Sequence, residues 1–345
     1  MTRGAALTGW GTAVPARICT NADLARDLPD LDDEWIVRRT GIRERRVAGP
    51  GQSTSSLATA AAASALAHAA VRPQDVGLVI VATTTPDQPT PATAPVVQAR
   101  IGATNAGAFD VNAACAGFLT ALAIGDAMIR TGAVRNAVVV GAEVLSRFVD
   151  GADPKTSVLF GDGAAAFVLE ASDEPAGLMG IELGSDGGGS TLLEIPAGGS
   201  LLPASAETVA HNLHTVRMNG AELYRRAVRV MTDVSMRALK NAGLSVGDID
   251  LVVPHQANQR IIDDVATHLG IDASRMVSNV ARYGNTSAAS VPLALAEAAQ
   301  QGRLHPGARV LLCAVGAGLV WGAGVVQWTA AVPDESKAIE IGASA

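Results

Sequence analysis

Two stretches of this 345-residue chain repeat one pattern at a distance of about half its length. The segment VRPQDVGLVIV at 71–81 is similar to LSVGDIDLVVP at 244–254, and a helical pattern precedes each of them. Further on, TGAVRNAVVV at 131–140 is similar to QGRLHPGARVLL at 301–312. A buried strand between helices that occurs twice predicts two α/β halves built on one plan. Chance similarity among alanine-rich segments is the alternative.

Size and composition agree with two such halves. At 345 residues, the chain exceeds the length that one hydrophobic core usually reaches. Hydrophobic residues make up 48% of it and charged residues 17%, which is typical of a well-buried α/β protein. We expect an N-terminal half over 1–172, a C-terminal half over 173–330 and a short, flexible polar tail over 331–345.

Charge and cysteine usage argue against several classes of function. A formal net charge of -7 does not suit a general nucleic-acid binder. No apolar run reaches the roughly 18 residues that a membrane span needs. Cys19, Cys115 and Cys313 are too widely spaced for a disulfide framework or a CxxC metal site. We therefore expect a cytoplasmic protein with no metal site and no membrane or nucleic-acid partner.

One cysteine lies at a predicted corner between a strand and a helix. The run AFDVN at 108–112 predicts a short buried strand, and the apolar run after it predicts a helix that ends at Gly132. At this corner, the unpaired N–H groups of the helix N-terminus would favour the thiolate of Cys115 over the thiol. Small neighbours would leave the sulfur open to a substrate. A buried, purely structural cysteine is the alternative interpretation.

The second half places two polar residues in comparable corners. The buried strand IDLVVP at 249–254 runs directly into His255, and open α/β sheets bind ligands at the carboxyl ends of their strands. Asn285 precedes an apolar helix similar in length and composition to the helix after Cys115. When Gly132 is aligned with Gly302, Asn285 falls opposite Cys115. Taken singly, His255 could be an ordinary hydrogen-bonded histidine and Asn285 an ordinary residue at a helix start.

Five strings occur along the chain in one order: DEWIVRRTGIRERR, NAACAGF, FGDGAA, VPHQAN and YGNTSAAS. In this order and spacing they resemble the β-ketoacyl-acyl carrier protein synthase III family of the thiolase superfamily, over about residues 5–328. The resemblance implies a thiolase-like fold, in which two duplicated α/β halves form a five-layered αβαβα sandwich. It also implies a homodimer.

The resemblance also implies a reaction and a catalytic triad of Cys115, His255 and Asn285. Cys115 would take the acyl group of an acyl-CoA primer, so that coenzyme A thioester is a substrate and no resident cofactor is needed. His255 and Asn285 would stabilise the enolate formed when malonyl-acyl carrier protein loses carbon dioxide. The backbone N–H groups of Cys115 and Ala317 would form the oxyanion hole.

Further residues are carried over from the family in the same way. Substrate-binding residues would be Trp35, Arg39, Asn258, Gly220 and Thr90, and carrier-protein docking residues would be Arg225 and Arg260. Trp35 and Arg39 suit an adenine nucleotide, because an indole stacks on a base and a guanidinium neutralises phosphate. Acyl carrier proteins are acidic, so a local basic patch on an acidic enzyme makes electrostatic sense.

Departures from the family bear on the primer. Housekeeping bacterial members often carry a phenylalanine at the position of Thr90, which closes the acyl pocket of the partner subunit. Val315 replaces another usual phenylalanine, and Pro154-Lys155 stands where an arginine is usual. A smaller gate residue predicts that acetyl-CoA is not the only good primer.

Three functions remain open from the sequence. The first is decarboxylative condensation, which would start fatty-acid synthesis or prime a polyketide. The second is an acyltransferase of the same fold that forms no carbon–carbon bond, and the third is a non-catalytic partner subunit. Intact His255 and Asn285 favour condensation, because simple acyl transfer has no enolate to stabilise.

Overall fold

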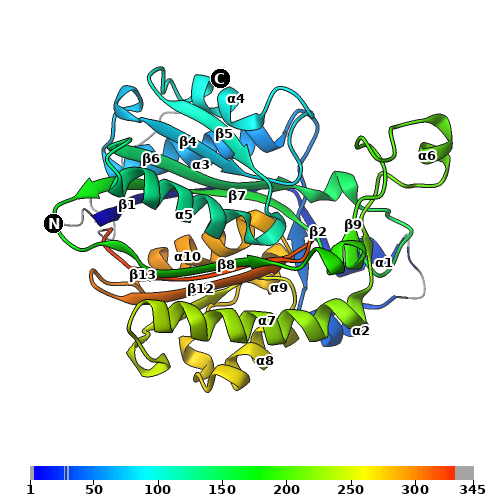
Figure 1. Cartoon of the computed structure of the whole chain (residues 1–345). Helices are drawn as coiled ribbons and strands as arrows, with labels where there is room; N and C mark the ends of the chain where they lie inside the picture. The colour runs from blue at the N-terminus through cyan, green and yellow to red at the C-terminus, as the bar shows by residue number, and fades with distance from the viewer. Residues whose placement is uncertain (1–3, 27, 29–30, 331–345) are drawn as a thin grey trace.

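Two β-sheets form the centre of the computed structural model, which describes residues 4–26, 28 and 31–330 (Figure 1). The first sheet has the order β1 (Gly4–Ala13), β7 (Asp162–Ser172), β6 (Asn136–Val144), β4 (Leu78–Ala82) and β5 (Gly107–Val111). The second has the order β11 (Leu251–Pro254), β12 (Arg309–Gly316), β13 (Val320–Gln327) and β8 (Gly177–Ser185). Strand β4 is parallel to β5 and β6, and β11 is parallel to β12. The predicted tail at 331–345 lies outside the described residues.

Helices cover both sheets and fill the space between them (Figure 1). The outer helices are α3 (Thr54–Ala69) and α4 (Thr93–Arg100) on the first sheet, and α7 (Gly220–Asn241) and α8 (Gln259–Leu269) on the second. Between the sheets lie α5 (Gly117–Arg130) and α10 (Ser290–Gln300). The result is five layers in the order αβαβα, as the sequence resemblance implied.

Short elements surround this core. They are the helices α1 (Asn21–Ala25), α2 (Asp33–Thr40), α6 (Ala206–Ala210) and α9 (Val280–Tyr283), and the strand pairs β2 (Ile18–Thr20) with β3 (Glu44–Arg46) and β9 (Leu193–Glu194) with β10 (Arg217–Met218). Figure 1 shows α6 on an arm that projects from the body of the molecule. Within the described ranges, no helix is both long enough and apolar enough to cross a membrane.

Small residues determine how closely the layers approach. The alanine-rich helix α3 packs on glycines of β1, where a Cβ atom on Gly11 would lie 2.4 Å from the backbone oxygen of Ala61. Larger side chains occupy the space between the two sheets, where Phe118 of α5 packs near Phe167 of β7 with ring centroids 5.6 Å apart. The many alanines and glycines of the sequence therefore reflect close contact between helix and sheet.

The internal repeat is visible in the element boundaries. Strands β1 and β8 begin at 4 and 177, β4 and β11 at 78 and 251, and β6 and β12 at 136 and 309, so the same spacing separates the members of each pair.

Helix α10 has 11 residues and α5 has 14, so the predicted equality in length is wrong. The alignment that pairs Gly132 with Gly302 is correct only at the C-terminal ends of helices α5 and α10. At the spacing of the strands Cys115 corresponds to Ala288, and the predicted pairing of Cys115 with Asn285 is wrong. A division of the chain between residues 172 and 173 remains a prediction.

Candidate active site

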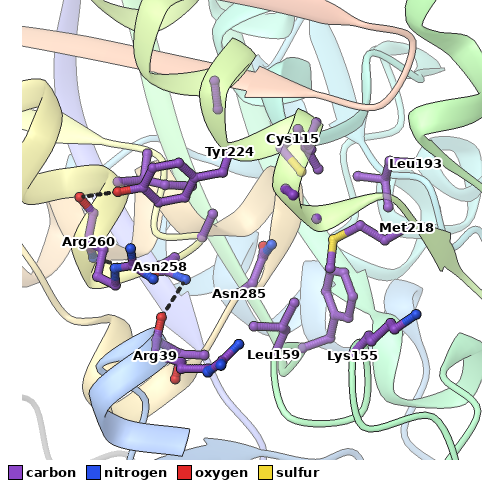
Figure 2. Close-up of a pocket in the computed structure, with 18 of the residues that line it drawn as sticks. Arg39, Cys115, Lys155, Leu159, Leu193, Met218, Tyr224, Asn258, Arg260 and Asn285 are labelled. Carbon is purple, nitrogen blue, oxygen red and sulfur yellow. Dashed lines mark hydrogen bonds between the residues drawn. The ribbon is translucent and has the colours of Figure 1, made fainter.

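A cavity of about 820 Å³ is lined by residues from both halves of the chain (Figure 2). Cys115 reaches it from the first half, and His255 and Asn285 reach it from the second. The three residues of the predicted triad, which are far apart in the sequence, therefore face one space.

Cys115 lies in a tight turn between β5 and α5. The 3₁₀ turn η2 (Ala114–Ala116) contains it, and Ala114 has a φ of 45°, in the left-handed region that a residue with a Cβ atom seldom adopts. Strand β12 supports the turn closely, because a Cβ atom on Gly316 would lie 2.5 Å from the backbone nitrogen of Cys115. The position of Cys115 thus depends on glycine at position 316.

The thiol of Cys115 is neutral in this environment. The side chain is only 5% exposed, and burial raises its pKa to about 12, with a further increase from the negative charge of Glu143. The nearby side chain of Ser287 acts in the opposite direction and lowers the pKa. The predicted thiolate is therefore wrong for the protein without substrate, because the cost of burying the charge exceeds the benefit of a helix N-terminus.

His255 follows β11 directly and is held by two contacts. Its backbone N–H donates to the carbonyl oxygen of Cys313 at 2.7 Å, and its Nδ1 atom lies 2.6 Å from Oγ of Ser290. The side chain is 3% exposed, and burial lowers its pKa to about 4. The imidazole is therefore neutral near pH 7, and Nε2 is the ring nitrogen left for a ligand.

Asn285 is fixed between the two halves by its backbone. Its N–H donates to the carbonyl of Leu159 at 2.8 Å, and its carbonyl accepts from the N–H of Gly161 at 3.0 Å. The side-chain oxygen accepts from the backbone N–H of Ser287 at 2.8 Å. Since Oδ1 is occupied, the amide group that remains for a ligand is the donor Nδ2.

The FGDGAA string has a structural role in this arrangement. Gly161 packs against the backbone of α9, where a Cβ atom would lie 2.2 Å from the carbonyl oxygen of Tyr283. Asp162 is buried and accepts hydrogen bonds from the backbone of Ala48 and from Ser146. This string therefore holds the segment that carries Asn285 in place.

The mouth of the cavity carries aromatic and cationic groups from several elements. The guanidinium of Arg39 lies 4.7 Å from the ring centroid of Trp35, and the side-chain amide of Asn258 donates to the carbonyl of Arg39 at 3.0 Å. The guanidinium carbon of Arg260 lies 5.2 Å from the ring centroid of Tyr224. Figure 2 shows the hydrogen bond that the Tyr224 hydroxyl donates to the Arg260 carbonyl. The predicted residues Trp35, Arg39, Asn258, Gly220 and Arg260 all line this cavity.

Three predicted residues do not line the cavity. Thr90 is exposed in the loop between β4 and α4, and Ala317 follows the lining residue Gly316. Arg225 lies in a separate surface depression with Asp186, Glu222, Arg226 and Arg229, where it forms an ion pair with Glu222. Their predicted roles as gate, oxyanion donor and docking residue remain predictions.

Comparison with known proteins relates this geometry to a family. The model of 3-oxoacyl-[acyl-carrier-protein (ACP)] synthase III matches residues 109–187, and the model of its C-terminal part matches residues 239–328. The beta-ketoacyl-[acyl-carrier-protein] synthase III of Roseiflexus sp. is 52% identical over 96% of this chain and 100% of its own. The chain belongs to the 3-oxoacyl-[acyl-carrier-protein] synthase III family.

Solved structures of synthase III proteins share the whole fold. The protein of Pseudomonas aeruginosa PAO1 is 42% identical, with a TM-score of 0.89 over 96% of this chain and 100% of its own. The priming beta-ketosynthase of the R1128 polyketide pathway is 35% identical, with a TM-score of 0.88 over 96% of this chain and 98% of its own. The predicted family and its thiolase-like, five-layered fold are therefore confirmed.

Two buried hydroxyl groups and one carboxylate of this synthase III site were missed from the sequence. The hydroxyl of Ser290 lies 2.6 Å from His255, and Ser287 lies near Cys115 and Glu143. Ser287 and Ser290 stand within the YGNTSAAS string, whereas Glu143 lies in an apolar strand with no motif around it. Within the described part of the chain, no cluster of three or more His, Cys, Asp or Glu residues could hold a metal ion.

Proposed function

We propose that this chain is a β-ketoacyl-acyl carrier protein synthase that joins an acyl-CoA primer to a malonyl carrier protein with loss of carbon dioxide. The observation that carries this proposal is one cavity lined by a cysteine thiol and by the neutral donors of His255 and Asn285. The names of the relatives support fatty-acid initiation and polyketide priming as the two settings of the reaction.

In the first half-reaction, the sulfur of Cys115 attacks the carbonyl carbon of the acyl-CoA thioester. The Cys115 proton leaves, the carbon–sulfur bond to coenzyme A breaks, and coenzyme A departs as the free thiol. Trp35, Arg39 and Arg260 at the cavity mouth suit the adenine ring and phosphates of that substrate. The backbone N–H groups of Cys115 and Ala317 would stabilise the transient oxyanion.

In the second half-reaction, the malonyl thioester loses carbon dioxide and its electron pair moves onto the thioester oxygen. Nε2 of His255 and Nδ2 of Asn285 would donate hydrogen bonds to that enolate. The enolate carbon then attacks the acyl carbon on Cys115, the bond between that carbon and the cysteine sulfur breaks, and the released thiolate takes up a proton from water. A pKa of about 4 for His255 supports this role, because a neutral ring holding its proton on Nε2 is a donor.

Primer choice is the finer part of the proposal. Val315 lines the cavity in place of a bulkier residue, and the small side chain of Thr90 would reach the acyl pocket of a second subunit. We expect primers longer than acetyl, or branched ones, to be accepted.

The outer strand β5 supports a homodimer, because the side chain of Phe109 on this edge strand is apolar and 38% exposed.

The carrier protein would approach the arginine-rich face at the start of α7. Arg225, Arg226 and Arg229 lie together there, and Arg260 stands at the cavity mouth. These charges are local, since the chain as a whole carries a net charge of -7. An acidic carrier protein would be attracted to this face and repelled elsewhere.

The three free cysteines suit a protein that works in the reducing conditions of the cytoplasm.

Mass spectrometry of the products from a mixed acyl-CoA pool and malonyl carrier protein tests the proposal. We expect β-ketoacyl carrier protein, stoichiometric release of carbon dioxide, and an acyl group trapped on Cys115. The Cys115→Ser variant should show no acylation. Acyl transfer without carbon dioxide would indicate the simple acyltransferase, and a protein that takes no acyl group would be a non-catalytic subunit.

A further inference from the structure

An arginine lies buried next to the segment that holds Asn285, and the two half-reactions above do not use it. Arg45 of β3, within the DEWIVRRTGIRERR string, is 1% exposed. Among the residues that the structure describes, no carboxylate forms an ion pair with it. Burial of a guanidinium without a counter-charge opposes folding. A buried charge of this kind therefore needs a specific reason for its presence.

The guanidinium of Arg45 connects two separate segments of the chain. Its Nη1 atom donates to the side-chain oxygen of Asn21 at 2.9 Å and to the carbonyl of Cys19 at 3.2 Å. On the other side, Nη2 donates to the carbonyl of Val158 at 2.8 Å. Val158 is buried, and in the described part of the chain its carbonyl accepts no other hydrogen bond. Arg45 is therefore the one donor that satisfies the start of residues 158–161, which we call the strap.

The side chain of Asn21 fixes the direction of this arginine. Its Nδ2 atom donates to the carboxylate of Asp33 at 2.7 Å and to the carbonyl of Ile42 at 2.8 Å. Because both Nδ2 protons are used, only Oδ1 is left to face Arg45. Asp33 lies in the first turn of α2, so the same network extends to a helix at the cavity mouth. The guanidinium thus points to the strap from a rigid support.

The strap in turn holds the backbone of Asn285. The two hydrogen bonds of Asn285 to Leu159 and Gly161 described above form a parallel β-bridge, and Figure 2 shows Leu159 beside Asn285. Both segments pass close to Arg45. A Cβ atom on Gly161 would lie 3.1 Å from the Cβ atom of Arg45, and one on Gly284 would lie 3.5 Å from it. A shift of this arginine would therefore be felt on both sides of Asn285.

The internal duplication indicates that the strand itself does not need an arginine. Strand β3 begins at 44 and β10 at 217, which is the spacing that separates the paired strands of the two sheets. Met218 of β10 therefore corresponds to Arg45 of β3, and each of the two strands pairs antiparallel with one short partner. Since methionine stands at this position in the second half, the guanidinium in the first half has another use.

We propose that Arg45 is a positioning residue for Asn285. Its guanidinium fixes the carbonyl of Val158, the strap that begins there fixes the backbone of Asn285, and the Nδ2 donor is thereby aimed at the enolate of the second half-reaction. Arg45 itself touches no substrate. This inference rests on the proposed function, and it assigns the arginine to decarboxylation and not to acylation.

The Arg45→Met variant of the full chain tests this role. Methionine keeps an apolar stem and removes the donors to Val158 and Asn21. We expect single-turnover release of carbon dioxide from malonyl carrier protein to slow about 10-fold, because a donor displaced from the reacting atoms loses much of its effect. Release of coenzyme A at saturating acyl-CoA should stay within about 3-fold of wild type, because the turn that carries Cys115 rests on β12 and not on the strap.

A double variant separates positioning from a general structural effect. If Arg45 acts through Asn285, its removal has no further effect on decarboxylation once the side-chain amide is gone. We therefore expect Arg45→Met combined with Asn285→Ala to release carbon dioxide within about 2-fold of the rate of Asn285→Ala alone. An arginine that merely supports the fold would slow both backgrounds by the same factor.

The matched control is Arg130→Met. Arg130 of α5 also connects separate segments, because its guanidinium donates to Asp126 at 2.7 Å and to two backbone carbonyl groups at 3.0 Å and 2.9 Å. It lies outside the cavity lining. We expect this variant to lower the melting temperature and to leave both half-reactions unchanged.

The Arg45→Lys variant keeps the test decisive if Arg45→Met does not fold. Lysine retains the buried charge but replaces the two-sided guanidinium fork with one ammonium group. We expect carbon dioxide release to slow in this variant as well, with coenzyme A release preserved.

Each other outcome overturns the positioning role. Carbon dioxide release at the wild-type rate in either Arg45 variant overturns it, and so does equal slowing of both half-reactions. Further slowing of Asn285→Ala by Arg45→Met also overturns it, because the arginine would then act independently of Asn285. Failure of the wild-type protein to release carbon dioxide would contradict the proposed function itself, which is a distinct result.

Discussion

Nδ1 of His255 lies 2.6 Å from Oγ of Ser290, and both side chains are buried. The backbone N–H of Gln256 also points to this oxygen, at 3.4 Å, so the serine accepts from Gln256 and can direct its own proton to Nδ1. Donation to Nδ1 places the ring proton of His255 on Nε2, which is the tautomer that can stabilise an enolate.

Loss of this contact should affect one half-reaction more than the other. In Ser290→Ala, we expect carbon dioxide release to slow about 10-fold, which corresponds to about 1.4 kcal/mol of transition-state stabilisation. Coenzyme A release should change less than about 2-fold, and Ser290→Thr should restore decarboxylation because it keeps the hydroxyl. Equal slowing of both steps, measured by single-turnover kinetics, would contradict the tautomer assignment.

The amide of Asn285 should matter for decarboxylation alone. We expect Asn285→Ala to slow carbon dioxide release about 100-fold, the usual cost of one donor to a developing oxyanion, and to spare acylation. Asn285→Asp is the sharper variant, because it keeps an oxygen for the N–H of Ser287 and removes the Nδ2 donor. Decarboxylation at the wild-type rate in Asn285→Asp would rule out the donor role.

The buried His255 should make stability depend on pH. Its pKa is about 4 in the folded protein and about 6.5 in an unfolded chain. Between these values the unfolded chain binds the extra proton, so the stability contribution falls as pH falls through this window. The free energy of unfolding of wild type relative to His255→Gln should therefore decrease by about 3 kcal/mol from pH 7 to pH 4. Urea unfolding at both pH values measures it, and a difference independent of pH would refute the assignment.

Thr90 should set the range of primers. We expect wild type to be acylated well by primers longer than acetyl, and Thr90→Phe to reduce the rates for long and branched primers about 10-fold relative to acetyl-CoA. Thr90→Ser is the control, since it keeps a small side chain. Acylation rates across a series of acyl-CoA lengths test this, and a sharp preference of wild type for acetyl-CoA would defeat the prediction.

Gly316 should be intolerant of any side chain. A Cβ atom there would lie 2.5 Å from the backbone nitrogen of Cys115 and 2.9 Å from Cβ of Ala114, so the turn that carries Cys115 would have to move. We expect Gly316→Ala to slow acylation at least about 10-fold and to lower the melting temperature. Gly199→Ala, with open space around it, should change neither quantity. If Gly316→Ala is acylated at the wild-type rate, the turn that carries Cys115 can shift to accommodate a side chain, and the prediction is wrong.

The sequence predicts the fold of this protein better than the details of its site. The similar segments around Asp75 and Asp248 already carry the constant spacing that relates the strands of the two sheets. The error at Cys115 arose because α10 is shorter than α5 and the loop after it is longer by the same amount, which shifts the alignment only near the helix ends. A comparison of strand segments does not detect such a local difference in the lengths of a helix and of the loop after it.

Electrostatics of the site depend on burial, which a sequence does not give directly. The corner position of Cys115 was predicted correctly, whereas its protonation state was not, because the effect of burial exceeds that of the helix N-terminus. Glu143 could not be found from its neighbours, since NAVVVGAEV is an ordinary apolar strand. Only the three-dimensional structure brings that carboxylate to Ser287, which lies in the other half of the chain.

Between turnovers, the sulfur of Cys115 is both enclosed and protonated. Peroxides attack the thiolate form of cysteine, and they react slowly with a neutral thiol that solvent hardly reaches. We therefore expect peroxide to convert Cys115 to sulfenic acid only slowly while no substrate is bound.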